Sequence, residues 1–429
     1  MLIRPVDPAP RTYPRFVTLL RRTRRGPACA PPTTDAAEVE RWLLRDAMKI
    51  DDFLLLSEEF FWRLAAAGAP LDRASLHVGT LHPQISGYGI IWLSSDRIVD
   101  EVEVDLRSLT QSAYKENPLF LVFENGETVR ADPRDPAARS RFPLFDDLHE
   151  AGVTDYLARP IGRSGGLNNA ATIGTFEPEG FSDVEIAEIG RLFDLFSLHT
   201  ERHIEAMVAR NIVDAYLGGI AGGEVLRGGI LRGDGRPIRA VIWCSDLRGF
   251  SERAERLAPE ETTAMLNLYF EALSGAVMAH GGEVLKFIGD GLLAVFPVAA
   301  EGEAAAAVRA VAAAQDGLAR VDAMNAAPPE GLAPGALPLK SGVALHLGEV
   351  FFGNVGAPDR LDFTVIGRAV NEAARVEALT KTLGREILVT APVAALAGAD
   401  AALEPMGDHA LRGVAAPMTI YAAPREAAP

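Results

Sequence analysis

The sequence predicts an α+β protein made of two globular parts, and three observations support this class. Residues 36–209 open with a helical pattern, continue through strand-like runs and close with a long helix, an order typical of antiparallel α+β domains. Residues 218–237 are rich in glycine and separate two well-patterned regions. From residue 238 a buried strand, a helix and a hairpin follow one another. The length of 429 residues also suggests two or three domains.

Composition limits the classes of function. Hydrophobic residues make up 48% of the chain and charged residues 23%, which is ordinary for a globular protein. The net charge of -16 argues against a nucleic-acid binder, because such proteins present a basic stripe or domain. Two cysteines, Cys29 and Cys244, are too few for a disulfide framework or a thiolate metal site, so we expect a cytoplasmic protein. No apolar run approaches about 18 residues, so we expect no membrane span.

The first 35 residues are predicted to be a disordered basic tail. They lack the apolar core of a secretory signal, and prolines interrupt their arginines. Such a tail either has no specific partner or contacts a membrane surface or a partner protein. The arginines are Arg4, Arg11, Arg15, Arg21, Arg22, Arg24 and Arg25.

Residues 36–209 are predicted to form the first domain. A helical pattern near its start is followed by the strand-like runs SLHV, YGIIWLSS, TDYLARPI and NNAATIGTFEP. A long helix then begins after Ser182, which is placed as its N-cap with acidic residues in the first turn. The apolar helical positions at the start are Val39, Trp42, Leu43 and Ala47.

This order resembles a GAF sensory domain. The resemblance rests on the segments HEAGVTDYLARPI and EPEGFSDVEIAEIGRLF and covers about 170 residues. It implies a module that binds a small molecule, although no ligand-defining set of residues stands out. A structural or dimerising module without a ligand remains the alternative.

The closing helix is predicted to continue to Leu217 and to carry two offset apolar stripes. Such a helix either pairs with its twin in a dimer and carries a signal, or packs on its own core. His199 and His203 lie four residues apart on it. Without a third nearby ligand we expect solvated histidines here rather than a metal site.

Residues 210–237 are predicted to be a linker and residues 238–423 the second domain. The strand IRAVIWCSD ends in Asp246, and a helix begins near Pro259 and ends at a glycine pair. Two strands follow, joined by a hairpin that contains Asp290. In such a palm the two aspartates can face each other and hold two hard divalent cations. Alternatively, Asp246 only caps a helix and Asp290 only makes a turn.

Three segments resemble the class III adenylate/guanylate cyclase catalytic domain, a ferredoxin-like palm. They are VIWCSDLRGFSE, GGEVLKFIGDGLLAVF and RLDFTVIGRAVNEAARVEAL, in the family's order and spacing. The resemblance implies that Asp246 and Asp290 bind metal. It implies that Lys286 and Thr364 select the purine, with Thr364 typical of one bacterial subgroup. It further implies the following roles: Asn371 and Arg375 orient the ribose and stabilise the transition state, Arg385 and Arg412 hold the terminal phosphates, and Gly249 and Phe250 contact substrate.

The chemistry of these residue types agrees with those roles. Asn371 and Arg375 are four residues apart on a predicted helix over 368–379 and share one face. An arginine offers a permanent charge and a rigid fork of donors to a phosphate, although Arg375 could instead pair with Glu372 on the surface. Lys286 is one of five lysines beside 37 arginines, and a lysine donor favours the N1 acceptor of adenine. Thr364 can accept from the 6-amino group but can also donate, so it discriminates less sharply than aspartate.

The sequence thus predicts an adenylate cyclase that converts ATP to cyclic AMP. The resemblance implies a homodimer with sites shared between subunits and two Mg²⁺ per site, with Mn²⁺ as a substitute. It also implies a small-molecule or bicarbonate effector. A guanylate cyclase that uses GTP and a catalytically silent nucleotide-binding scaffold are the alternatives. Arg368 stands where many relatives carry aspartate, and we expect it to affect dimer contacts or loop order.

Overall fold

The computed structural model describes residues 9–425 except 165–166, 299–300, 330–331 and 334. The described residues divide into two compact units, one that ends at Ala215 and one that begins at Tyr216. No helix among the described residues combines the length and the apolar character needed to span a membrane.

The first unit is built on a seven-stranded antiparallel sheet with the order β1-β4-β3-β2-β7-β6-β5. Its strands are β1 (Val17–Thr23), β2 (Arg73–Gly79), β3 (Ile85–Leu93), β4 (Ile98–Asp105), β5 (Val129–Ala131), β6 (Asp155–Ser164) and β7 (Leu167–Thr175). Its helices are α1 (Ala36–Arg45), α2 (Phe53–Ala66), α3 (Ser112–Lys115), α4 (Pro118–Asn125), α5 (Pro136–Arg141), α6 (Leu144–Glu150) and α7 (Asp183–Leu217). The sheet-rich α+β class agrees with the predicted GAF-like architecture.

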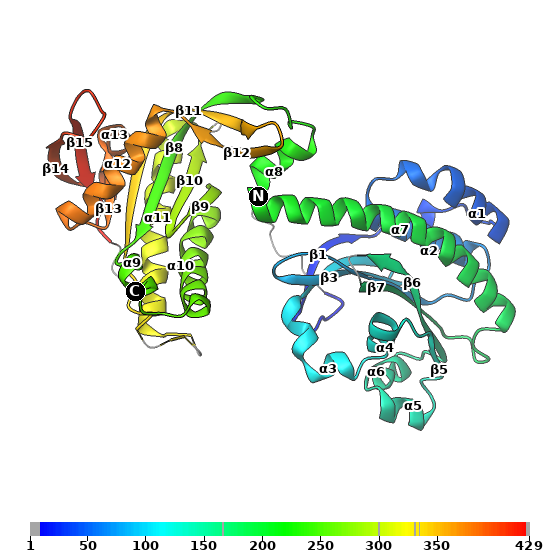
Figure 1. Ribbon diagram of the computed structural model, residues 1–429. Helices are drawn as coiled ribbons and strands as arrows, with labels where there is room; N and C mark the ends of the chain where they lie inside the picture. The colour runs from blue at the N-terminus through cyan, green and yellow to red at the C-terminus, as the bar shows by residue number, and fades with distance from the viewer. Residues whose placement is uncertain (1–8, 165–166, 299–300, 330–331, 334, 426–429) are drawn as a thin grey trace. The chain divides into compact units, whose positions relative to one another are not determined.

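Helices cover both faces of this sheet (Figure 1). On one face α1, α2 and α7 enclose an aromatic core in which Phe60 stacks on Phe196 at 4.1 Å between ring centroids. On the other face α4 and α6 pack over β6 and β7. The predicted cap of α7 is present, because Ser182 and Glu185 exchange side-chain to backbone hydrogen bonds.

The expectation of a disordered tail is wrong for residues 9–35. Val17–Thr23 is strand β1, which pairs antiparallel with β4 at the edge of the sheet. Arg22 donates to fully buried Asp100 at 2.6 Å, and Arg25 donates to fully buried Glu58 at 2.6 Å. Buried carboxylates need such partners, so the arginines serve the fold. Arg4 and the rest of residues 1–8 lie outside the described residues.

The expectation of solvated histidines on α7 is also wrong. His199 is buried and its Nε2 lies 2.8 Å from the backbone oxygen of Leu43. The ring of His203 packs 5.3 Å from that of Phe53. Both rings contribute to the packing between α7 and the preceding helices.

The second unit contains an eight-stranded sheet in the order β14-β15-β13-β11-β8-β10-β9, with β12 paired to β11. Its strands are β8 (Gly235–Leu247), β9 (Glu283–Ile288), β10 (Gly291–Pro297), β11 (Ser341–Ala357), β12 (Arg360–Ile366), β13 (Ile387–Thr390), β14 (Glu404–His409) and β15 (Met418–Ala422). Its helices are α8 (Gly219–Leu226), α9 (Phe250–Ala254), α10 (Pro259–Ala279), α11 (Gly302–Ala326), α12 (Arg368–Leu383) and α13 (Ala391–Ala397).

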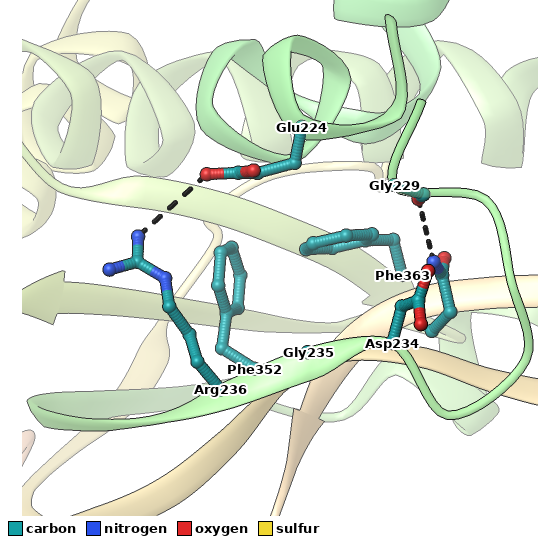
Figure 2. Close-up of a pocket in the computed structure, with 8 residues that line it drawn as sticks. Glu224, Gly229, Asp234, Gly235, Arg236, Phe352 and Phe363 are labelled. Carbon is teal, nitrogen blue, oxygen red and sulfur yellow. Dashed lines mark hydrogen bonds and ion pairs between the residues drawn. The ribbon is translucent and has the colours of Figure 1, made fainter. Parts of the chain in front are cut away.

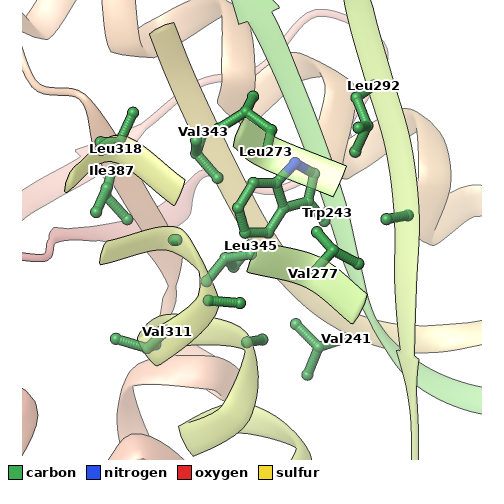
Figure 3. Packing of buried hydrophobic residues seen from close by; sticks show 14 of the residues in the cluster. Val241, Trp243, Leu273, Val277, Leu292, Val311, Leu318, Val343, Leu345 and Ile387 are labelled. Atoms are coloured by element: carbon green, nitrogen blue, oxygen red, sulfur yellow. The ribbon is translucent and has the colours of Figure 1, made fainter. Parts of the chain in front are cut away.

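The central strands of this unit form the predicted ferredoxin-like palm. The chain order β8-α10-β9-β10-α11-β11 and the spatial order β11-β8-β10-β9 are those of a βαββαβ fold. Helices α10 and α11 cover one face, where Trp243 is fully buried in the core (Figure 3). Helices α8 and α12 cover the other face. Both faces of the central strands are therefore buried, and functional groups are left at their ends.

Candidate active site

Asp246 and Asp290 meet at one end of the palm. Asp246 lies near the end of β8 and pairs in register with Gly291, the residue after Asp290. Gly289 has a φ of +62°, a conformation that favours glycine and lets the hairpin turn tightly. The neighbouring Gly291 packs against β8 so closely that a Cβ there would lie 2.9 Å from the Ser245 carbonyl oxygen. Local backbone geometry therefore holds the two carboxylates together.

The electrostatics of this pair are those of a site with excess negative charge. Burial raises the pKa of Asp246, and the adjacent Asp290 carboxylate raises it further. The positive charges of Arg248 and Lys381 lower the pKa of Asp246, but their effects are smaller than those of burial and of Asp290. Mg²⁺ in proteins is commonly held by one or two carboxylates together with substrate phosphates. The pair fits that requirement, although no group of three or more His, Cys, Asp or Glu ligands is assembled among the described residues.

Arg248 ties the turn after Asp246 to helix α12. Its guanidinium lies 3.5 Å from the Glu377 carboxylate and donates to the Thr380 hydroxyl. A Cβ on Gly342 would overlap this guanidinium, so the glycine makes room for it. Sequence reasoning did not single out Arg248, Glu377 or Lys381. The only available signal was the position of Arg248 two residues after Asp246.

Gly249 and Phe250 complete the turn. Gly249 has a φ of +69° and precedes α9, and Phe250 packs against the hydrophobic core next to the sheet. Arg253 donates to the carbonyl oxygen of Arg248 at 2.6 Å and closes the turn from the helix side. The Phe250 ring therefore serves packing, and its backbone remains as the group that could contact a substrate.

The two predicted purine-selecting residues lie on β9, which pairs with β10, and on β12, which pairs with β11. Lys286 forms an ion pair with Asp362, which sequence reasoning missed. Asp362 and Thr364 share one face of β12, because they are two residues apart on a strand. Thr364 is 6% exposed, and its hydroxyl has no hydrogen-bond partner among the described residues. The ion pair therefore connects Lys286 on β9 to β12, the strand that carries Thr364.

Asn371 and Arg375 lie exposed on α12. Neither side chain makes a hydrogen bond or ion pair with another described residue. The alternative partner of Arg375, Glu372, instead accepts from Arg368 at 2.6 Å and lies 3.1 Å from His346. Arg368 therefore belongs to a side-chain network that joins α12 to β11, and its expected effect on dimer contacts or loop order stays a prediction.

The two predicted phosphate-binding arginines lie next to the outer strands of the sheet, Arg385 before β13 and Arg412 between β14 and β15. Arg385 donates to Glu404 on β14 at 2.7 Å. Arg412 is exposed and makes no ion pair with a described residue. Their role at the phosphates stays a prediction.

A separate pocket of 190 Å³ lies where α8 meets the start of β8 and the β11–β12 hairpin (Figure 2). Glu224 and Arg236 face each other across it at 3.8 Å. The rings of Phe352 and Phe363 form its apolar wall, with centroids 4.8 Å apart. Neither predicted metal ligand lines this pocket.

Comparison with known proteins agrees with this geometry. The family described as "Adenylate and Guanylate cyclase catalytic domain" matches residues 239–423. The chain is 32% identical over 179 residues to "Adenylate cyclase 1" of Rhizobium meliloti, covering 41% of this chain and 26% of that protein. It is 36% identical over 154 residues to "Adenylate cyclase" of Anabaena cylindrica, covering 36% and 29%. The chain thus spans less than a third of the length of these relatives.

Two solved structures are also similar in sequence to part of this chain. The adenylyl cyclase CyaB from P. aeruginosa is 29% identical, with 45% of this chain and 97% of that chain covered and a TM-score of 0.39. The guanylyl cyclase Cya2 is 33% identical, with 45% and 94% covered and a TM-score of 0.38.

The βαββαβ palm with paired aspartates at its strand ends is a nucleotidyl cyclase domain. The family match over residues 239–423 makes the assignment specific. The C-terminal unit belongs to the class III adenylate and guanylate cyclase family, and adenylate cyclases are among its relatives.

Proposed function

We propose that this protein is an adenylate cyclase that converts ATP to 3′,5′-cyclic AMP and pyrophosphate. The observation that carries the proposal is the pairing of Asp246 with Asp290, two partly buried carboxylates held together without a cation of the chain between them. Support also comes from the adenylate cyclases among the relatives of this domain.

Asp246 and Asp290 would hold two Mg²⁺ ions, or Mn²⁺ in their place. Bound there, the ions would favour ionisation of the ribose 3′-hydroxyl and neutralise charge on the phosphates. With the ions bound, Asp246 and Asp290 would place the α-phosphate at the end of β8. The 3′-hydroxyl would give up its proton to water, and its oxygen would form a bond to the α-phosphorus as the bond to the pyrophosphate oxygen breaks.

The remaining groups would come from the second subunit of a homodimer. Asn371 and Arg375 are exposed and unpaired on α12, which leaves them free to reach a nucleotide held by another chain. Asn371 would orient the ribose, and Arg375 would stabilise charge that develops on the α-phosphate. Arg385 and Arg412 are the candidate contacts of the terminal phosphates. To bind a phosphate, Arg385 would have to break its ion pair with Glu404.

Lys286 and Thr364 would select adenine. The ammonium of Lys286 is oriented by Asp362, and the buried Thr364 hydroxyl is left with an unused donor and acceptor. A lysine donor matches adenine N1, which accepts, and opposes guanine N1, which carries a proton. GTP is therefore the weaker substrate in this proposal.

The first unit would regulate the second. We assign residues 36–209, together with strand β1, to a sensory domain, residues 210–237 to a transducing segment and residues 238–423 to the catalytic domain. Support comes from α8, whose Ile220 amide donates at 2.8 Å to buried Glu283 on β9, three residues before Lys286. A small molecule or bicarbonate is the proposed effector.

The shared site can be tested by mixing inactive variants. Full-length Asp246→Ala and Arg375→Ala chains should each be inactive with ATP, Mg²⁺ or Mn²⁺. Their mixture should regain up to about a quarter of wild-type activity, because a mixed dimer has one intact site. Activity with GTP in place of ATP measures the purine choice. A mixture that stays as inactive as its parents contradicts the shared site, and wild-type protein that binds ATP without turnover contradicts the enzyme.

A further inference from the structure

The N-terminal sheet carries a row of polar side chains on the face that α4 and α6 cover. Along β2, Ala74 and Leu76 belong to the core beneath α2 and α7. Alternation along a strand therefore turns Arg73, Ser75 and His77 to the opposite face. This is the side of the sheet that lies above α4 and α6 in Figure 1. An arginine and a histidine in the centre of a sheet are unusual, because burial disfavours their charged forms.

The register of the sheet brings further polar groups beside them. Arg73 and Tyr156 both pair with Gly174, so the three residues form one row across β2, β7 and β6. In the next row Ser75 lies opposite Thr172, and their hydroxyl oxygens are 2.6 Å apart. Gly174 adds no side chain between Arg73 and Tyr156, although Val153 packs over it.

His77 extends this cluster along β2. Its Nε2 lies 2.8 Å from the Ser75 hydroxyl, and it pairs in register with Gly89 and Ala170. Burial lowers its pKa to about 4, so the ring is neutral at pH 7. Nδ1 of this ring has no hydrogen-bond partner among the described residues.

Two groups in the cluster lack partners. The Tyr156 side chain is 2% exposed, and its hydroxyl has no partner at hydrogen-bond geometry among the described residues, although the Thr172 hydroxyl is close enough to lower its pKa slightly against the effect of burial. The Arg73 guanidinium takes part in no ion pair or hydrogen bond of the described residues, and burial lowers its pKa. Asp147 on α6 influences that pKa but is exposed and forms no ion pair with Arg73. Arg73 and His77 nevertheless keep part of their surface accessible.

An unpaired guanidinium and an unpaired hydroxyl on one row have the chemistry of an anion site. A guanidinium binds a planar carboxylate through two parallel hydrogen bonds, and a phenol can donate a third. We propose that this face of the N-terminal sheet binds a small anion with a planar carboxylate group, held by Arg73 and Tyr156. Organic carboxylates and bicarbonate share this group. The proposal does not depend on the catalytic assignment.

The test is isothermal titration of the full-length chain with sodium acetate, sodium succinate and sodium bicarbonate, with sodium chloride at equal ionic strength as the control salt. We expect at least one of the three anions to bind and chloride not to bind. Arg73→Met should weaken that binding by about tenfold or more, and Tyr156→Phe by about threefold to tenfold. Arg24→Met, which removes an exposed arginine without a partner, should leave it unchanged.

The thermal midpoint of the anion-free protein gives a second test. Arg73→Met should raise the midpoint by about 2–4 °C, because it removes a buried charge that has no partner. Tyr156→Phe should not lower it, because the lost hydroxyl has no partner. The proposal is overturned if none of the three anions binds at about 10 mM, or if binding survives Arg73→Met. A lower midpoint for Arg73→Met would also overturn it, because the arginine would then be a structural residue.

Discussion

Replacing Asp290 by asparagine should stabilise the metal-free protein while it abolishes cyclase activity. The physical reason is the repulsion between Asp290 and Asp246, which share a partly buried position at the end of β8. A carboxylate that only makes a turn would show the opposite effect, because its loss removes a favourable contact.

The magnitude follows from the charges around the pair. Two unit charges about 4 Å apart interact by about 1 kcal/mol in water and about 4 kcal/mol at an effective dielectric constant near 20. Both carboxylates are partly exposed, and Arg248 and Lys381 offset part of the repulsion. We therefore expect Asp290→Asn to raise the free energy of unfolding by about 1 kcal/mol at pH 7.

The dependence on pH has a definite sign. The pKa of Asp246 is higher in the folded protein than its ordinary value, so the folded state holds the proton more tightly than the unfolded state. The stability from this group is present at low pH and is lost as the pH rises through the folded pKa. In Asp290→Asn one cause of the raised pKa is absent, so this loss should be smaller.

Urea denaturation in the presence of a chelator, between pH 4 and pH 8, measures both effects. Asp359→Asn is the matched control, because Asp359 is exposed in the β11–β12 turn and makes no ion pair with a described residue. Added Mg²⁺ should stabilise the wild-type protein and have little effect on Asp290→Asn. A lower stability of Asp290→Asn at every pH, with the control unchanged, would refute the view that the two carboxylates form a cation site.

Three further outcomes follow from the same site. Arg375→Ala should lower kcat by about 10²–10³-fold, because the side chain would stabilise the transition state. The unfolding midpoint should not change, because the side chain is exposed and makes no ion pair with a described residue. Steady-state kinetics and thermal unfolding together would distinguish this catalytic role from a structural one. Asp362→Asn should lower the preference for ATP over GTP by up to about tenfold, because Lys286 loses the partner that orients it; the ratio of kcat/KM values measures it, and an unchanged ratio would contradict the orienting role. Arg248→Met should cost about 1–3 kcal/mol of stability by leaving Glu377 without its ion pair, and a double-mutant cycle with Glu377→Gln should recover most of that as coupling.

Local patterns predicted much of the fold. The capping box at Ser182, the hairpin at Asp290 and the helix that carries Asn371 and Arg375 depend on residues close in sequence. Capping, turn formation and helical spacing act over three to five residues, so they can be seen without a tertiary structure. The pairing of Asp246 with Asp290 was expected from the order of strand, helix and hairpin.

Long-range pairing was not predictable in the same way. The arginines near the N-terminus have the composition of a tail, yet Arg22 and Arg25 neutralise buried acids from distant segments. His199 sits on a helix like a surface residue, yet it packs against α1. No local sequence pattern identifies these partners, because each partner lies more than thirty residues away along the sequence.

The sequence alone determined the α+β class and the two-part organisation, and it named the groups that the proposed function uses. These properties depend on residue type and on short spacings, which the order of the residues already contains. Only the tertiary structure decided which charges meet: Lys286 pairs with Asp362, Arg248 pairs with Glu377, and Arg73 pairs with no acid among the residues that the structure describes. The reason is that a charge is compensated by its neighbours in space, and strand register and helix packing choose those neighbours.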